Sequence, residues 1–307
     1  MADALISIQD FATLLDERYA EVIEMELASQ RDVRGDIFAM DSMDRRTIRR
    51  TSIGSYGNIP EFTGQLAYDR PYEQYNVEAT ARTFASGLRI TQEMLEDDLS
   101  SIMNGDLFRP MARATVVTQN KHAAWLFNFA DSNDVYWYTR SEGVPLASSA
   151  HLTRTPGIST AAGFDNLIVD VLSPTSYRAA AIMFRQFRDD RGELIDQSHD
   201  ELWVPTAQGP RAYEIIKTPK IPDDNRNAVS PEYNSATIKE LIHWNSTENW
   251  ALMNGQARRD NCKWLDYVPI DYFRIKEFDT FQAKWAIRGR WTQMVFDWRF
   301  ALWAIAQ

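Results

Sequence analysis

The 307-residue sequence has few cysteines and histidines and lacks long apolar runs. Its one cysteine, Cys262, cannot form a disulfide within the chain, and we expect it to lie in the core or in a strand. No two of the four histidines are three or four residues apart, so the HExxH pattern of a zinc-binding helix is missing. No run approaches the roughly 20 apolar residues of a membrane helix. The N-terminal "MADALISIQD" is unlike a signal peptide, and we expect a cytoplasmic protein.

The motifs of common enzymes are missing too. The sequence has no GxxxxGK[ST] or GxGxxG phosphate loop and no GxSxG nucleophile elbow. The segment "DDRGE" (Asp189–Glu193) resembles part of a calcium-binding loop, but the turn after a helix explains it better. We therefore predict no catalytic residue, no cofactor, no metal site and no enzyme activity.

The charge balance is acidic, with a formal net charge of −10 and a pI near 5.0. This argues against a generic nucleic-acid-coating surface, which needs a basic stripe to displace counterions, but it leaves room for one local basic patch. Hydrophobic residues make up 44% of the chain and charged residues 25%, which is typical of a folded protein with a large core. The aromatic content is high, as it is in cores and in interfaces between proteins.

The first 90 residues predict two extensions rather than a compact unit. Residues from about Ile8 to Ala28 have helical spacing and indicate an amphipathic N-terminal arm within residues 1–44. Residues 45–90 predict a long antiparallel hairpin with a wide, turn-rich tip. Its strands are polar on both faces, so the hairpin cannot bury itself; either another chain covers it or it is flexible.

Residues 91–200 predict a short acidic helix at about Thr91–Met103 and a long spine helix over about 109–130. Pro110 suits the first turn of that helix. One face of the spine helix is traced by Ala114, Val117, Lys121, Ala124 and Phe127. A further helix has Ser173 as N-cap, Pro174 at its first position and Gly192 as its stop.

The remaining sequence predicts alternating short strands and helices. We expect a buried strand at "ELWVP", a helix at "AQGPRAYEIIKT", and strands at "TIKELIHW", "NWALMN" and "CKWLDYVPI" within residues 201–272. Residues 273–307 predict two long strands broken near Thr292. The predicted fold class is α+β.

Two charged clusters are candidate contacts between subunits. Glu93, Glu96 and Asp97 share one helix face opposite an apolar face, which favours a solvated helix over a metal or catalytic site. A contact with a neighbouring chain is the other alternative. Alternation puts four arginines on both faces of a strand, where they are solvated, pair with acids of a neighbour, or contact packaged nucleic acid. These are Arg45, Arg46, Arg49 and Arg50.

The order of these elements resembles the major capsid proteins of tailed bacteriophages with the HK97-type fold, and most closely the Mu-like major head subunits. The segment "GLRITQEMLEDDL" is similar to that family's junction between the extended loop and the spine helix. "GVPLASSAHL" is similar to the loop after the spine, and "RDDRGELI" with "ELWVPTAQGPRAYEII" to its helix, turn, strand and helix. "RWTQMVFDWRFALWA" is similar to its closing strands in the peripheral domain, with Asp297-Trp298-Arg299 the most recognisable tripeptide.

The resemblance implies a head structural protein that forms pentamers and hexamers of an icosahedral shell around double-stranded DNA, assembled in the host cytoplasm and ending in the virion. It implies an N-terminal arm (1–44), an extended loop (45–90), a peripheral domain (91–200), an axial domain (201–272) and C-terminal strands that return to the peripheral domain (273–307). Implied partners are other copies of the chain, a portal, and decoration proteins. An encapsulin-like cargo shell is the alternative, and an enzyme is the weakest one.

Three further expectations accompany the resemblance. Some relatives weld their shells by an isopeptide bond from a lysine of the extended loop, but the first lysine here is Lys121, so we expect no such bond. The sequence goes from Met1 directly into the arm, so we expect a separately encoded scaffold. Gly87 is the candidate hinge at the base of the extended loop, where the strand is expected to break.

Overall fold

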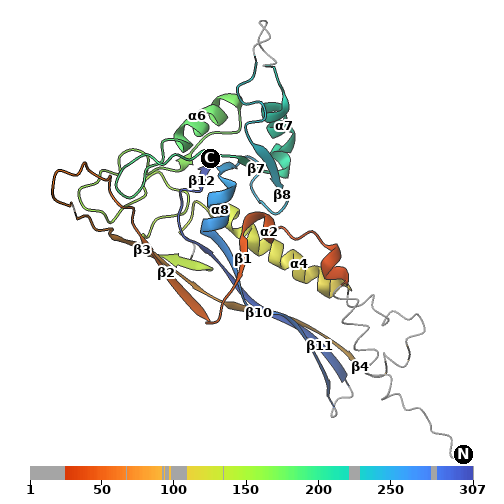
Figure 1. Cartoon of the computed structure of the whole chain (residues 1–307). Helices are drawn as coiled ribbons and strands as arrows, with labels where there is room; N and C mark the ends of the chain where they lie inside the picture. Colours follow the sequence, from red (N-terminus) through yellow and green to blue (C-terminus); the bar gives the residue numbers. More distant parts are fainter. Residues whose placement is uncertain are drawn as a thin grey trace, which may run out of the picture.

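The structure is a computed structural model, and it describes residues 25–66, 68–91, 93, 97, 109–133, 135–220, 229–277 and 282–306. These residues form three β-sheets with helices packed beside them. Figure 1 shows a five-stranded sheet in the upper part of the molecule, a long four-stranded sheet below it, and a three-stranded sheet at the left. The predicted α+β class is confirmed.

The five-stranded sheet is the centre of the main core. Its spatial order is β6 (Leu167–Ile168), β12 (Ala301–Ala304), β9 (Trp250–Met253), β7 (Glu201–Pro205) and β8 (Thr237–Leu241). Every residue of β7, β9 and β12 is buried, so both faces of these strands are covered. Trp203, Trp250 and Trp303 lie fully inside this core. The helix α6 (Pro174–Phe184) packs against β9 and β12, while α7 (Gly209–Lys217), which follows the short helix η1 (Thr206–Gln208), packs against β7 and β8.

The start of α6 is as predicted, but its end is not. The Ser173 hydroxyl accepts a hydrogen bond from the Ser176 backbone N–H (3.1 Å), and the Ser173 backbone N–H donates to the Ser176 hydroxyl (2.9 Å). The helix ends at Phe184, well before Gly192. Gly192 has a φ of +83° in the turn of a small hairpin whose arms meet at Arg188 and Leu194. "DDRGE" is this hairpin turn, so our assignment of Gly192 as a helix stop was wrong.

The long sheet has the order β1 (Ala39–Ser42), β10 (Cys262–Glu277), β11 (Gln282–Val295) and β4 (Arg82–Thr91). The helix α8 (Gly255–Asn261) leads into β10 at Cys262. Cys262 is completely buried, as expected, and burial raises the pKa of its thiol, which keeps it protonated and inert.

The spine helix consists of α4 (Arg109–Ala123) and the single turn α5 (Trp125–Asn128). The face traced in the sequence is buried only at its C-terminal end, at Ala124 and Phe127, whereas Ala114 and Lys121 are exposed. The buried residues of α4 are Ala112, Val116, Gln119, Asn120 and Ala123. Asn120 belongs there because its side chain binds backbone groups of the segment before α2 (Arg34–Ile37): it accepts from the Val33 N–H (3.0 Å) and donates to the Arg31 carbonyl (2.8 Å).

An aromatic cluster fastens the C-terminal end of α4 to the long sheet. Phe84 of β4 stacks on Trp291 of β11 at 4.5 Å between ring centroids and lies 4.6 Å from the His122 ring. The Trp291 indole N–H donates to Nδ1 of His122 (3.2 Å). Burial lowers the pKa of His122 to about 4, so this imidazole is a neutral acceptor at physiological pH.

The third sheet has the order β2 (Thr47–Ile53), β3 (Glu73–Thr80) and β5 (Tyr138–Arg140). The antiparallel pairing of β2 with β3 confirms the hairpin, but β3 has a core of its own. Its Val77 and Ala79 pack with Met43, Leu265 and Met294. The hairpin is therefore bound to its own subunit along β3, whereas β2 remains an exposed edge.

Two strand boundaries differ from the predicted ones. The predicted second hairpin strand is split at Ala81 into β3 and β4, and β4 pairs with β11 rather than with β2. β4 also continues through Gly87, which lies opposite Ala286, so the expected break there is wrong. Likewise β11 continues through Thr292, and the chain turns only after Val295. β12 then joins the five-stranded sheet, away from β11.

A buried ion pair connects α8 to the five-stranded sheet. The Arg258 guanidinium donates to both carboxylate oxygens of Glu201 (2.9 and 3.0 Å), and a further nitrogen donates to the Ile37 carbonyl. The Trp203 indole N–H donates to the same carboxylate (2.8 Å). Burial would raise the pKa of Glu201, but Arg258 and Trp203 outweigh it and lower that pKa.

Candidate inter-subunit surface

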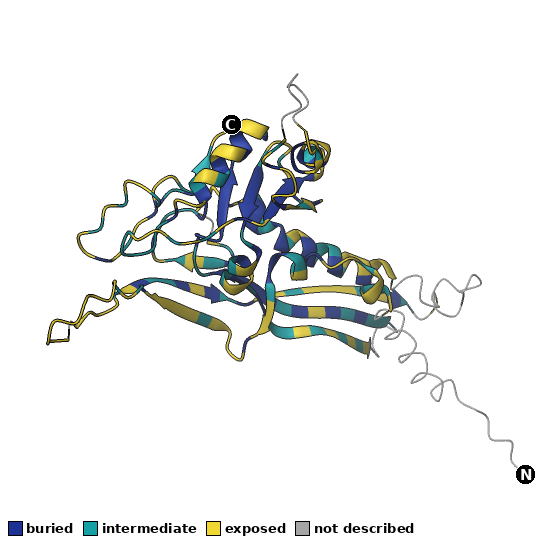
Figure 2. Ribbon diagram, turned by 45° about the horizontal axis from the view of Figure 1, so that its top comes forward, coloured by how far each residue is buried: buried dark blue, intermediate teal, exposed yellow. Residues whose placement is uncertain are grey.

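The loop that joins β2 to β3 is the most exposed apolar segment described. We call residues 54–72 the tip. Its apolar side chains include Ile59 (90% exposed), Phe62 (68%), Leu66 (70%) and Tyr68 (92%). Figure 2 shows the tip as a mostly exposed projection at one end of the molecule, far from the buried strands. Several large apolar side chains exposed on one short projection indicate a surface that another protein covers.

The tip is fixed at its root to the hairpin turn at Asp189–Glu193. Arg191 donates to the backbone carbonyls of Ser55 and Arg70 (both 2.9 Å) and forms an ion pair with Asp69 (2.7 Å). The Ser55 hydroxyl donates to Asp189 (2.6 Å). We call the contacts of Arg191 with Ser55, Asp69 and Arg70 the root clasp. One planar guanidinium thus bridges both strands of the loop where they leave the body.

The turn that carries Arg191 is closed by hydrogen bonds of its own. The other Asp189 oxygen accepts from the backbone N–H groups of Arg191 and Glu193 (both 2.9 Å). The Asp189 backbone N–H donates to the Glu193 carbonyl (2.8 Å), and the Gly192 N–H donates to the Asp189 carbonyl (3.1 Å). An aspartate that accepts two backbone bonds holds a tight turn, so Arg191 is presented in a defined direction.

The tripeptide Asp297-Trp298-Arg299 binds this turn through the Arg299 side chain. Arg299 donates to the Arg188 carbonyl (2.7 Å) and to Asp190 (3.0 Å), and it also binds Asp297 (3.1 Å). Burial would raise the pKa of Asp297, but the nearby charge of Arg299 dominates and lowers it. Trp298 lies parallel to the buried His151 ring at 4.2 Å. The tripeptide therefore connects the core to the turn, and the turn to the tip.

The four predicted arginines lie at the start of β2 and just before it. All four are exposed. Arg49 stands opposite Glu78 across the β2–β3 ladder, and the Arg50 guanidinium lies 5.0 Å from the Phe296 ring. Their role in contacts between subunits stays a prediction.

The predicted acidic cluster is described only in part. Glu93 and Asp97 are exposed, and the Asp97 backbone N–H donates to the Glu93 carbonyl (2.9 Å), a helical bond. Glu96 lies outside the described residues. Within the described ranges, no three His, Cys, Asp or Glu side chains are placed to hold a metal ion. No helix among these residues is long and apolar enough to cross a membrane.

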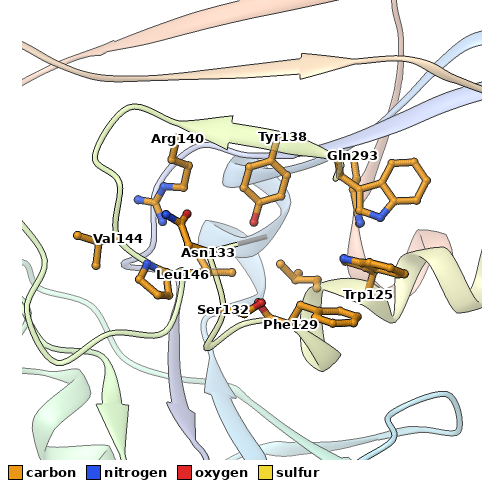
Figure 3. A pocket seen from close by; sticks show the side chains of 12 residues that line it. Trp125, Phe129, Ser132, Asn133, Tyr138, Arg140, Val144, Leu146 and Gln293 are labelled. Carbon is orange, nitrogen blue, oxygen red and sulfur yellow. The ribbon is translucent and has the colours of Figure 1, made fainter. Parts of the chain in front are cut away.

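A small cavity lies between the end of the spine helix, β5 and β11. Figure 3 shows Trp125 and Phe129 on one side, Tyr138 and Arg140 on another, and Gln293 from β11. Its volume of about 30 Å³ is far below the several hundred Å³ of a typical substrate pocket. This cavity therefore does not suit a substrate.

A larger groove of about 610 Å³ is lined by one side of the N-terminal half of α4 and by strands of the long sheet. We call it the helix–sheet groove. Its apolar lining comes from both sides and includes Phe84, Leu88, Met111, Ala114, Ile287 and Trp291. Ala114, an exposed residue of α4, borders this groove.

Arg191, Asp69 and Ser55 were not among the residues predicted from the sequence. Ser55 and Arg191 are 136 positions apart, and no local pattern connects them. The one available hint was an arginine inside the aspartate- and glycine-rich segment "DDRGE", where a turn presents a side chain outward.

Comparison with known proteins gives a consistent result. The sequence model of the family described as phage capsid protein matches residues 74–304. No curated protein sequence matches the chain.

Three solved structures share the fold. The procapsid of bacteriophage JBD30 has a TM-score of 0.54 at 12% identity, covering 100% of this chain and 77% of that one. Microbacterium phage Oxtober96 has 0.55 at 11%, covering 91% of each chain. The capsid of an empty GTA particle has 0.53 at 11%, also covering 91% of each. These matches confirm the expected HK97-type capsid fold.

Because the family match spans most of the sequence, this chain belongs to the phage capsid protein family and is a capsid structural protein.

Proposed function

We propose that this chain is the major head subunit of a tailed phage and that its copies form a closed icosahedral shell around double-stranded DNA. The observation that supports this best is the tip, an apolar projection held in a fixed direction by the root clasp. A subunit gains nothing alone from such a projection, whereas each copy in a lattice can lay its tip on a neighbour. Many weak contacts of this kind sum to a stable shell.

The partners follow from the same proposal. The main partner is another copy of the chain, in pentamers and hexamers. A portal, a separately encoded scaffold and decoration proteins complete the particle, which is assembled in the host cytoplasm. We also propose that Mu-like head subunits are its nearer relatives. Intact-mass measurement of mature heads tests the separate scaffold, because loss of an N-terminal piece would contradict it.

Electron microscopy of the purified protein tests the shell directly. We expect closed shells or capsomer rings, and a monodisperse small monomer would overturn the proposal. Nucleic acid extracted from particles of the native host is expected to be double-stranded DNA. Protein cargo without a genome would point instead to a compartment of the encapsulin type.

A tip variant tests the observation that carries the proposal. Phe62→Ser should greatly reduce shell yield while the subunit stays folded, because Phe62 is 68% exposed in the single chain. Val135→Ser is the matched control, since Val135 is also exposed (59%) but lies outside the tip. Equal losses in both variants would contradict a specific role for the tip.

Covalent welding through the extended loop is not part of the proposal, because the first lysine of the chain is Lys121. We expect mature particles, boiled and reduced, to give a single monomer band. A ladder of covalent multimers on that gel would contradict this.

A further inference from the structure

The most deeply buried histidine lies in the long segment between β5 and β6. The His151 ring is completely buried, and both of its nitrogens have a polar partner. Nδ1 lies 3.0 Å from a carboxylate oxygen of Glu142, and Nε2 lies 3.1 Å from the side-chain oxygen of Asn166. A neutral imidazole has one donor and one acceptor nitrogen, whereas the imidazolium has two donors. The partners therefore decide which form the ring takes.

The Asn166 side chain presents an acceptor to His151. Its amide nitrogen donates to the carbonyls of Leu146 (3.0 Å) and Ala301 (3.2 Å), and its oxygen accepts from the Ser148 N–H (2.8 Å). The reversed amide would point its N–H groups at another N–H and its oxygen at two carbonyl oxygens, so these three bonds fix its orientation. Nε2 of His151 must then be a donor.

The Glu142 carboxylate presents an acceptor as well. One oxygen accepts from the Leu152 N–H (2.9 Å) and the other from the Arg140 guanidinium (2.8 Å). Burial would raise the pKa of Glu142, but the hydrogen bond from His151 and the charge of Arg140 outweigh it and lower that pKa. An ionised carboxylate has no proton to donate, so Nδ1 of His151 must be a donor too.

The surroundings of the ring suit a positive charge. The His151 ring lies parallel to the Trp298 indole at 4.2 Å, within the range of a cation–π contact. Among the described residues, the charged side chains that join this group through ion pairs or the indole are Arg140, Arg299, Glu142, Asp190 and Asp297. These are two cations and three carboxylates. A positive His151 therefore brings the cluster to charge balance, which a buried group of ions needs.

We propose that His151 is an imidazolium in the folded subunit at neutral and mildly alkaline pH, and that its second proton is a structural part of the fold. The charged ring joins Glu142, near the start of the segment, to Asn166, which in turn binds β12 through the Ala301 carbonyl. Loss of that proton would leave a bare nitrogen facing an acceptor oxygen, so alkali should loosen the segment from the five-stranded sheet. The inference is independent of the proposed function, because every group in it belongs to one chain.

Nitrogen NMR of the full-length folded subunit, with a heavy isotope in the histidine rings, tests the proton directly. It is recorded at about pH 8, well above the ordinary histidine pKa of about 6.5. Burial lowers the pKa of His122, His199 and His243, so these three rings are neutral at that pH. We expect one ring with protons on both nitrogens. His151→Gln should remove this signal, and the matched control His243→Gln should keep it.

Four neutral rings in the wild-type spectrum overturn the inference, and this result needs no variant to fold. A doubly protonated ring that survives in His151→Gln overturns it as well.

The pH dependence of stability gives a second readout. A proton that the folded chain keeps and the unfolded chain releases makes stability fall as the pH rises. Between about pH 7 and pH 8 the folding equilibrium constant of the wild type should therefore fall roughly tenfold relative to that of His151→Gln. Denaturation curves at both pH values measure this, and equal pH dependence of the two proteins would also overturn the inference.

Discussion

Two arginine–carboxylate pairs in this subunit have similar chemistry and different surroundings. Arg258 and Glu201 join α8 to β7, and their side chains are 1% and 10% exposed. Arg191 and Asp69 hold the root of the tip, and their side chains are 19% and 35% exposed. The first pair is part of a core that is complete within one chain. The second orients a projection whose own apolar residues are uncovered. The comparison separates residues that keep the subunit folded from residues that prepare it for assembly.

The largest expected effect comes from breaking the buried pair. Arg258→Met should lower the free energy of unfolding by about 3–5 kcal/mol, because Glu201 is left buried without its partner. Chemical denaturation of dissociated subunits, followed by tryptophan fluorescence, measures this. Arg258→Met/Glu201→Leu should be less destabilised than the single variant, since no charge is left unpaired. A double variant as unstable as the single one would show that packing, not the charge, matters.

The second largest effect is expected from acid, which should lower the free energy of unfolding. Burial lowers the pKa of His122 and of His199 to about 4, from an ordinary value of 6.5. The unfolded chain therefore takes up protons first as the pH falls below 6.5, and stability is lost from there down to about 4. We expect about 1–2 kcal/mol per histidine between pH 6.5 and 4.5. Denaturation curves at both pH values test this, and His199→Gln should flatten the dependence. An unchanged slope would show that His199 is not responsible.

A smaller effect on folding is expected from the root clasp. Arg191→Ala should change the free energy of unfolding little, because water screens a pair this exposed. Shell yield should nevertheless fall several-fold, since the tip loses its fixed direction. Arg154→Ala removes the same charge from an exposed loop that contacts Tyr75, outside the tip, and is the control. A large loss of stability in Arg191→Ala, or equal shell yields from both variants, would contradict the distinction drawn here. Arg191 would then serve folding, as Arg258 does, rather than assembly.

The smallest effect is expected at Gly87. A Cβ there would lie 3.1 Å from the Trp285 carbonyl oxygen, a tight contact that requires a shift of only a few tenths of an ångström. Gly87→Val should change stability by less than about 1 kcal/mol. Our proposal of a hinge at Gly87 predicts fewer mature heads from this variant than from Ser86→Val. Equal yields from both variants would end the hinge proposal.

Local patterns predicted the elements that depend on neighbouring residues. Ser173 and Pro174 identified the start of α6, and the all-apolar "ELWVP" identified β7. Partners distant in sequence could not be predicted. In the sequence pattern, β4 looks like a continuation of β3. Only the folded chain shows that β4 pairs with β11. The predicted end of β11, near Thr292, was too early, because the alternation of polar and apolar residues does not reveal where a strand turns. The turn comes at Asp297, whose carboxylate accepts a hydrogen bond from the Trp298 N–H (2.7 Å).

The candidate site shows the same division. Exposure of the tip was foreseen, since its sequence is turn-rich and its hairpin polar. The root clasp was missed, because it joins two loops that only the folded body brings together. The buried core under β3 was missed for the same reason, since Leu265 and Met294 come from strands near the other end of the sequence.

The position of β12 has a consequence for synthesis. β12 lies between β6 and β9, yet it is translated after every other strand of its sheet. Until residues 301–304 emerge from the ribosome, β6 and β9 have unpaired edges, and such edges pair readily with other chains. At ordinary elongation rates this interval after β9 lasts roughly 2 to 10 s. A polysome that makes many copies of a shell protein side by side therefore exposes unpaired edges of β6 and β9 close to one another. We expect the need of the nascent chain for chaperones to increase with the length of this interval.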